Sequence, residues 1–224
     1  MDGCGCDRGF EIFDRRNAED DLARYRKRGP DRTTKLLLDM VRAAGVRGGT
    51  LLDIGAGIGV IDHELVRDGI GHATLVDASA PSLAAARDEA RRRGQVDRLE
   101  FVDGDFVSRA SSIDPADIVT LDRVICCYPD VTSLVRESAS RARALYALVL
   151  PRDRWIIRVG ARLENLWFRL RGLRYRAYAH PNSLVDSLVS DAGLTVRTEA
   201  WTFFWRIVLY DRGSSATTGA TATT

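Results

Sequence analysis

Short apolar runs alternate with helical patterns from residue 50 to about residue 193, and this alternation constrains the fold more than any other feature. The runs that we interpret as strands cover residues 50–55, 73–79, 98–106, 117–125 and 146–151. Strands that alternate with helices form a parallel sheet that is covered on both faces. Two further runs, 194–201 and 203–211, follow each other without a helix, so the last strand must pair antiparallel. We therefore predict an α/β fold with a doubly wound, mostly parallel, seven-stranded Rossmann-like sheet.

The chain has 224 residues and contains no stretch that reads as an interdomain linker, which predicts a single domain. We expect an N-terminal arm or lid over 1–30 and a main domain over 31–212. An insert covers 152–178, after the fifth strand. The last residues, 213–224, are small, polar and repetitive, so we expect a disordered tail there.

A glycine-rich loop, DIGAGIG, directly follows the first strand. It contains Asp53, Gly55, Gly57 and Gly59. Glycine lets the chain turn tightly and lets a ligand approach the backbone. The dinucleotide fingerprint needs a third small residue, and Val60 occupies that position, so the loop fails the NAD pattern. In open parallel sheets this loop lies where ligands bind.

The G-x-G-x-G spacing after an acidic residue resembles the first motif of class I S-adenosylmethionine-dependent methyltransferases. The resemblance implies that S-adenosylmethionine is the cofactor and that the loop residues bind it. It also implies that Asp77, next to Ala78, accepts hydrogen bonds from the ribose hydroxyls. Asp105 and Phe106 would then hold the adenine, and Asp122 would end the fourth strand beside the sulfonium.

Residues from about 10 to 211 resemble, more specifically, the magnesium-protoporphyrin IX O-methyltransferases, which esterify a porphyrin propionate. The likeness lies in DIGAGIG, in LDRVICCYPD (121–130) and in YRAYAHP (175–181). It implies that Cys127 and Tyr128 line the acceptor pocket as catalytic residues. The chain departs from the family at Cys127, where the family has a histidine thought to take part in catalysis. Because neighbouring side chains of an extended segment point to opposite sides, we expect Cys126 to be a small buried neighbour.

The predicted function is methyl transfer from S-adenosylmethionine to a small, anionic molecule, by O-methylation of a porphyrin-like carboxylate. Two alternatives stay open. One is S-methylation of a thiol or soft metalloid held by cysteines, and the other is a cofactor-binding protein without turnover. We expect no nucleic-acid partner, because the net charge is only +2. No apolar run reaches the length of a membrane span and the N-terminus lacks an export pattern, which favours a cytoplasmic protein.

The arm and the remaining cysteines and histidines give weaker signals. Phe13, Leu22 and Tyr25 share one side of an expected helix, and the resemblance implies a lid in which Tyr25 reaches the methionine end of the cofactor. An ordinary surface helix is the alternative. Cys4 and Cys6 could join the later cysteines around a soft ion, but we predict no metal site. We expect two histidines on surfaces away from the site and one at the pocket rim: His63, His72 and His180.

The insert is basic and amphipathic, with eight arginines and two acidic residues over 152–178. Its apolar residues at helical spacing are Val159, Leu163, Leu166, Trp167 and Leu170. We consider three interpretations: a lid that presents arginine to an anionic acceptor, a peripheral contact with anionic lipid, and a helix packed on the sheet edge. The sequence does not predict the oligomeric state.

Overall fold

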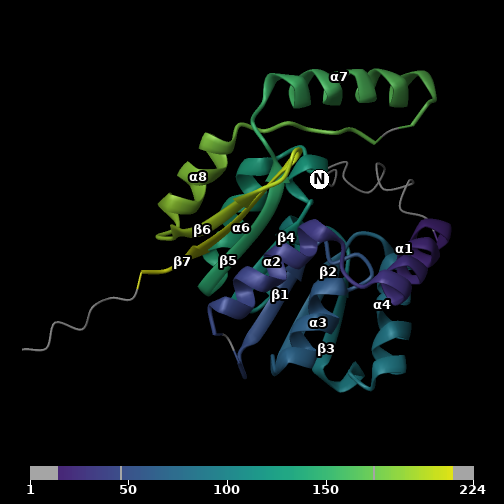
Figure 1. The fold of residues 1–224 in the computed structure, drawn as a ribbon, viewed down its shortest axis with the longest axis vertical. Coiled ribbons are helices and arrows are strands. Elements are labelled where there is room, and N and C mark those ends of the chain that lie inside the picture. Colours follow the sequence, from purple (N-terminus) through teal and green to yellow (C-terminus); the bar gives the residue numbers. More distant parts are fainter. Residues whose placement is uncertain (1–14, 46, 174, 214–224) are drawn as a thin grey trace, which may run out of the picture.

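The computed structural model describes residues 15–45, 47–173 and 175–213. Within them, one seven-stranded sheet has the order β3-β2-β1-β4-β5-β7-β6 (Figure 1). The strands are β1 (Thr50–Ile54), β2 (His72–Asp77), β3 (Leu99–Asp103), β4 (Ala116–Asp122), β5 (Ala142–Pro151), β6 (Thr195–Trp201) and β7 (Trp205–Asp211). The first five strands pair in parallel, and β7 runs antiparallel to both β5 and β6. The predicted fold class is confirmed.

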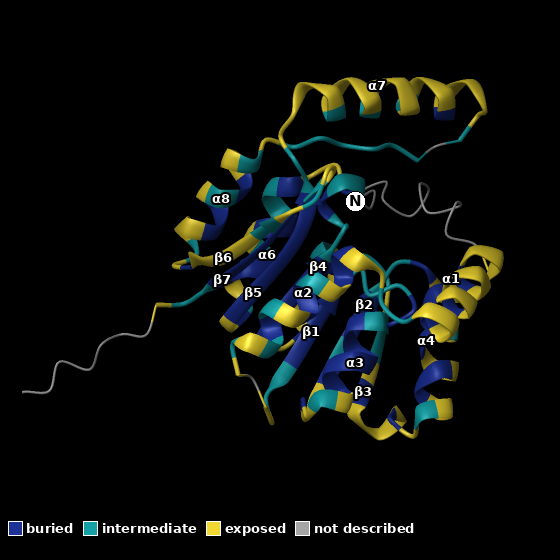
Figure 2. Cartoon of the chain, viewed as in Figure 1, coloured by how far each residue is buried: buried dark blue, intermediate teal, exposed yellow. Residues whose placement is uncertain are grey.

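Helices cover both faces of this sheet. They are α1 (Arg15–Arg28), α2 (Arg32–Ala43), α3 (Val60–Asp68), α4 (Ala80–Arg93), α5 (Phe106–Arg109), α6 (Val131–Ser140), α7 (Trp155–Leu170) and α8 (Asn182–Asp191). Successive strand residues point to opposite faces, so Leu51 packs with α2, α3 and α4, whereas Leu52 packs with α5, α6 and α8. Both faces are therefore apolar, as a parallel sheet between two helical layers requires (Figure 2).

Some element boundaries differ from the sequence-based prediction. The helix expected to run to residue 145 ends at Ser140, and β5 begins at Ala142. Ala142 pairs with Ala116 of β4, and the apolar side chains of Ala142 and Leu145 are buried in the sheet. Pairing with a neighbouring strand has thus overridden a local pattern that also fits a helix.

Helix α1 packs beside α4 and over the loop that follows β1. Ala18, Leu22 and Tyr25 of α1 form a small buried cluster with Ile58 of the loop. The Arg26 guanidinium pairs with the buried carboxylate of Glu89 at 2.8 Å. This part of the predicted arm is therefore attached to the sheet domain, whereas residues 1–14, including Cys4, Cys6 and Phe13, lie outside the described residues, as does the tail from 214 on.

Helix α7 forms the core of the insert and stands off the sheet (Figure 1). Its single buried residue is Phe168. The interpretation as a helix packed on the sheet edge is therefore wrong, because α7 leaves most of its apolar side chains exposed (Figure 2). None of the helices in the described part of the chain is long and apolar enough to cross a bilayer.

Candidate active site

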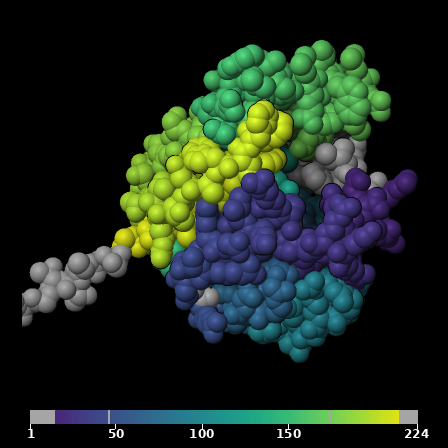
Figure 3. Space-filling view, in the orientation of Figure 1, coloured from purple at the N-terminus to yellow at the C-terminus, as the bar shows by residue number. Residues whose placement is uncertain are grey.

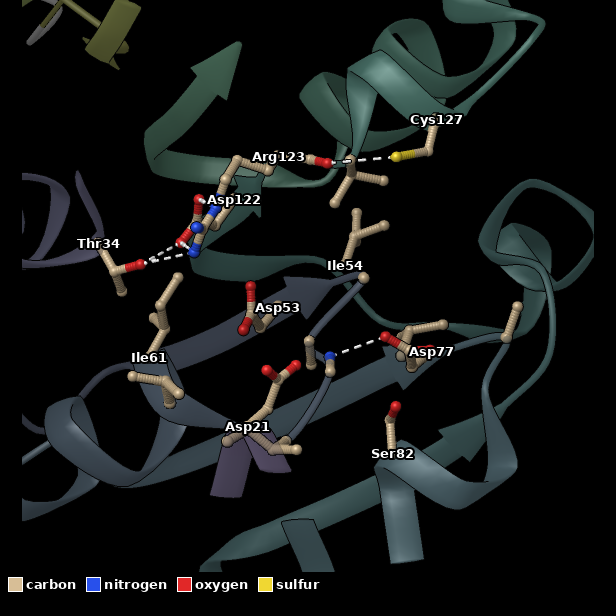
Figure 4. A pocket seen from close by; sticks show the side chains of 18 of the residues that line it. Asp21, Thr34, Asp53, Ile54, Ile61, Asp77, Ser82, Asp122, Arg123 and Cys127 are labelled. Atoms are coloured by element: carbon tan, nitrogen blue, oxygen red, sulfur yellow. Dashed lines mark hydrogen bonds and ion pairs between the residues drawn. The ribbon is translucent and has the colours of Figure 1, made fainter. Parts of the chain in front are cut away.

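A cavity of about 660 Å³ opens at the carboxyl ends of the parallel strands. The ends of β1, β2 and β4 and the segment after β3 form its floor, and α1 and the segment after α7 supply walls (Figure 4). In the strand order β3-β2-β1-β4, the topological switch point lies between β1 and β4. Open α/β sheets bind ligands at such a switch point. Every predicted site residue except Gly59 lines the cavity. Their contact with a ligand remains a prediction.

The glycine loop adopts backbone conformations that other residues avoid. Gly55, Gly57 and Gly59 have φ of 69°, 56° and 74°. A Cβ on Gly57 would meet nothing within 4 Å, so this position borders open space, whereas one on Gly55 would lie 2.4 Å from Val124. A Cβ on Gly59 would meet Leu75 at 2.9 Å. Gly57 therefore leaves room for a ligand, and Gly59 lets α3 start close to the sheet.

Asp77 at the end of β2 lies beside the loop and is bonded to it (Figure 4). Its carboxylate accepts hydrogen bonds from the Gly57 N–H at 2.7 Å and from the Ser79 N–H at 2.7 Å. Burial raises the pKa of Asp77 above its ordinary value, although both N–H groups oppose the shift. Carboxylate oxygens accept several hydrogen bonds each, so Asp77 can hold the loop and still accept bonds from a diol.

Asp105 and Phe106 lie beyond β3 rather than within it, and Asp105 caps α5 by accepting from the Ser108 N–H at 2.9 Å. Its other oxygen accepts a 2.8 Å hydrogen bond from the Tyr128 hydroxyl. Phe106 is buried and offers an apolar wall. A carboxylate beside an aromatic ring suits a flat heterocycle with an amino group, which fits the adenine predicted here.

Two buried carboxyls lie under the glycine loop. Asp53 accepts a 2.5 Å hydrogen bond from the Thr120 hydroxyl. Asp62 lies beside Asp53, and a proton on either carboxyl joins the two by a hydrogen bond. Burial, together with repulsion between the pair, raises the pKa of Asp53, and burial raises the pKa of Asp62 to about 7. The pair therefore keeps a proton at a pH where an exposed aspartate has lost it.

Polar side chains that the sequence analysis missed surround Asp122. The Thr34 hydroxyl donates to Asp122 Oδ2 at 2.5 Å, and Arg123 Nε donates to Oδ1 at 2.8 Å (Figure 4). Arg123 also pairs with Asp31 at 2.8 Å and has a φ of 62°, in the left-handed region. No sequence motif predicts this contact, because it joins the start of α2 to the end of β4. It fixes the end of β4 at the cavity wall.

The cysteine segment is a turn, which corrects our expectation of an extended chain. Residues Ile125–Cys127 form one turn of 3-10 helix, so Cys126 and Cys127 both line the cavity. Their sulfurs lie 3.6 Å apart. Our expectation that Cys126 is a small buried neighbour is therefore wrong. Interaction with the Cys126 thiol lowers the pKa of Cys127, and the same interaction raises the pKa of Cys126.

The segment after α7 covers this turn, which the sequence analysis did not foresee. The Tyr175 hydroxyl lies 2.9 Å from the Cys127 sulfur, and the Tyr178 N–H donates to the Cys126 carbonyl at 2.7 Å. His180 Nε2 lies 2.9 Å from the Tyr128 carbonyl oxygen. The segment YRAYAHP (175–181) thus covers the turn. His180 contacts the backbone and is not among the cavity-lining residues.

Tyr25 and His63 occupy a buried contact on the other side of the loop. Tyr25 lines the cavity, but its hydroxyl donates to Glu64 Oε1 at 2.8 Å. Its catalytic role remains a prediction. His63 is fully buried, with Nδ1 3.0 Å from Gln95 Oε1. The expected surface position of His63 is wrong, because α1 and α4 cover it, whereas His72 is exposed as expected.

The class of the chain follows from this fold, its glycine loop and a match to a known domain. Residues 21–121, less than half of the chain, match the family model described as "Methyltransferase small domain". The fold is that of the class I S-adenosylmethionine-dependent methyltransferases, which confirms the class inferred from the loop. The S-adenosylmethionine prediction agrees with neighbours of the same fold that were crystallised with this cofactor or its demethylated product.

Among solved structures, the chain is similar to magnesium protoporphyrin IX methyltransferase from Synechocystis PCC 6803. The TM-score is 0.63 at 16% identity, over 95% of this chain and 89% of that one. It is also similar to an O-methyltransferase family protein from Burkholderia thailandensis, with a TM-score of 0.68 at 19% identity, over 93% of this chain and 64% of that one. The predicted resemblance to the protoporphyrin enzymes is thus confirmed for the fold.

One curated relative is named as a methyltransferase of a ribosomal protein. Ribosomal protein L11 methyltransferase from Enterobacter sp. (strain 638) is 33% identical over 73 residues, which is 33% of this chain and 25% of that protein. The match spans about a quarter of the relative's length. The match therefore leaves the acceptor to be argued from this chain.

Proposed function

We propose that this chain transfers a methyl group from S-adenosylmethionine to a small anionic acceptor, with a carboxylate as the favoured group. The observation that carries the proposal is one continuous cavity that reaches from the glycine loop to the cysteine turn. Its volume of about 660 Å³ is within the range of small-molecule sites. Arg28 of α1 contributes to its wall and would favour a negatively charged acceptor, whereas Arg24 is paired with Asp21.

The residues divide into two groups along the cavity. Asp77, Asp105 and Phe106 would hold S-adenosylmethionine, which supplies a methyl carbon on a positively charged sulfur. Cys127, Tyr128 and Tyr175 would orient the acceptor and keep water out. An acceptor carboxylate is ionised at neutral pH and needs no base. The described cavity-lining residues accordingly include no histidine.

A second candidate acceptor is a thiol or a soft trivalent metalloid. The observation that favours it is the pair of thiols, 3.6 Å apart and both at the cavity wall. Soft ions prefer sulfur ligands, and a two-sulfur site could hold one. Among the described residues, no group of three or more histidine, cysteine or acidic side chains is arranged around a common point for a metal, so this site would use two sulfurs.

The test is methyl transfer from labelled S-adenosylmethionine into separate pools of porphyrins, other carboxylates, thiols and arsenite, with the products resolved by mass spectrometry. We expect a methyl ester in a carboxylate pool. A methylated thiol or arsenical would favour the second candidate. Binding of the cofactor without any labelled product would instead indicate a cofactor-binding protein without turnover. We place the protein in the cytoplasm on the sequence features given above.

A further inference from the structure

Helix α7 exposes an unusual amount of apolar surface. Trp155, Leu163 and Leu170 have exposed fractions of 68%, 62% and 78%. The exposed apolar residues of the helix are Trp155, Ile156, Val159, Leu163, Leu166, Trp167 and Leu170. At 3.6 residues per turn they fall within one arc of roughly 120°. We call this arc the outer face of α7.

The segment that follows α7 packs against the opposite side of the helix. Asn165 exchanges two hydrogen bonds with the backbone of Ala177, both 2.7 Å long. The Phe168 ring meets the Tyr175 ring edge-on, with centroids 5.2 Å apart. Because these contacts fix the inner side, the outer face points away from the molecule, and Figure 3 shows α7 as a ridge at one end.

Exposed apolar side chains also lie on the turn between β6 and β7. Phe203 and Phe204 are 62% and 55% exposed. The Arg154 guanidinium, just before α7, lies 5.6 Å from the centre of the Phe203 ring. The turn therefore lies beside the start of the helix (Figure 1). Contiguous exposed apolar patches of this kind mark interaction sites.

Arginines border the outer face. Arg158, Arg162 and Arg169 follow one flank at helical spacing, and the Arg171 guanidinium lies over the Trp167 ring at 4.4 Å. Glu164 is the one acidic residue within α7. Arginine stems cover apolar surface while their charged ends stay in water. An apolar ridge with arginine borders and two tryptophans has the chemistry of a helix that lies in the surface of an anionic bilayer.

We propose that α7 and the β6–β7 turn bind the surface of an anionic lipid bilayer, with the outer face inserted among the lipids. A second copy of the chain fits less well, because pairing two outer faces would bring their arginine borders together. The segment that follows α7 roofs the acceptor end of the cavity through Tyr175 and Cys127. Lipid binding would therefore place the acceptor end near the membrane. The proposal does not depend on which acceptor is used.

Sedimentation with lipid vesicles tests this inference on the full chain. We expect binding to phosphatidylcholine vesicles that contain phosphatidylglycerol, weaker binding to phosphatidylcholine alone, and loss of binding at high salt. Leu163→Glu combined with Leu170→Glu should weaken binding at least tenfold, because the apolar contribution is lost. Val96→Glu is the matched control, since Val96 is 38% exposed and lies before β3 at the other end of the sheet.

Charge is tested separately with Arg162→Glu combined with Arg169→Glu, against Arg91→Glu combined with Arg136→Glu. Only the first pair should reduce binding. Circular dichroism and cofactor affinity should stay unchanged in all variants, which shows that they fold. The proposal is overturned if the parent chain binds neither vesicle type, or if the α7 variants bind as tightly as the parent chain. It is also overturned if the parent chain is a dimer that the α7 substitutions dissociate.

Discussion

The Tyr175 hydroxyl lies 2.9 Å from the Cys127 sulfur, and this contact joins the insert to the turn that ends β4. Tyr175→Phe removes the hydroxyl and keeps the ring against Phe168. We expect the apparent KM for the acceptor to rise severalfold while cofactor affinity stays within about twofold, because only the acceptor end loses a contact. Steady-state kinetics and calorimetry measure the two effects. An equal loss of both would show that the contact is structural.

The role of Cys127 depends on the acceptor, so Cys127→Ser separates the two candidate functions. With a carboxylate acceptor we expect substantial activity to remain, since the wall needs shape more than sulfur. With a thiol or metalloid held by the cysteines, turnover should be abolished.

Cys126→Ser should give the same result as Cys127→Ser under either candidate, because both thiols line the cavity. Alkylation mapping by mass spectrometry, with and without arsenite, checks the same point. If neither thiol reacts and both are freely replaceable, the assignment of this turn to the acceptor site fails.

Asp77→Ala should weaken S-adenosylmethionine binding at least tenfold. Two charge-assisted hydrogen bonds to the ribose are each worth about 1.5–3 kcal/mol, and the Gly57 N–H also loses its acceptor. Asp103→Ala is the control, because Asp103 is the register partner of Asp77 on β3 but is exposed and outside the cavity lining. Calorimetry measures the affinity of each variant for S-adenosylmethionine and for NAD. Binding of NAD, or an unchanged affinity of Asp77→Ala for S-adenosylmethionine, would contradict the cofactor assignment.

The Asp53–Asp62 pair predicts a dependence of stability on pH. An unfolded aspartate has a pKa of about 3.9, whereas that of Asp62 is raised to about 7 by burial. Between these values the folded state binds more protons than the unfolded state, so the free energy of unfolding falls as pH rises. Asp62→Asn should remove the part of this fall that Asp62 contributes, on the order of 1 kcal/mol per unit of pKa difference, while the buried Asp53 keeps its own part.

Denaturant unfolding of Asp62→Asn and of the parent chain from pH 4 to 8 measures the difference between them. The contributions of the other carboxylates to the pH dependence cancel in that difference. Asp88→Asn, at an exposed position on α4, should leave the profile unchanged. A parallel pair of curves for Asp62→Asn and the parent would contradict the raised pKa.

Local patterns predicted the sheet and the glycine loop after β1. The strand at DIGAGIG is a short apolar run, and the loop needs glycine for its positive φ angles, so their positions follow from the residues themselves. The turn at Cys126 has no such signal, since four residues without a period fit an extended chain equally well. His63 is buried because α1 and α4, which come from other parts of the sequence, cover it. The exposed outer face of α7 likewise depends on where the insert lies, which helical spacing does not reveal.

The central claim is that this chain methylates a small carboxylate through the cavity at the strand ends. Its most direct test is to incubate the protein with labelled S-adenosylmethionine and a cell extract, and then to separate low-mass products from protein and RNA. We predict label in a low-mass fraction that mild base releases as methanol, as methyl esters do, and much less label with Asp77→Ala at a limiting cofactor concentration. Label in ribosomal protein or in RNA, with none in the low-mass fraction, would contradict the account.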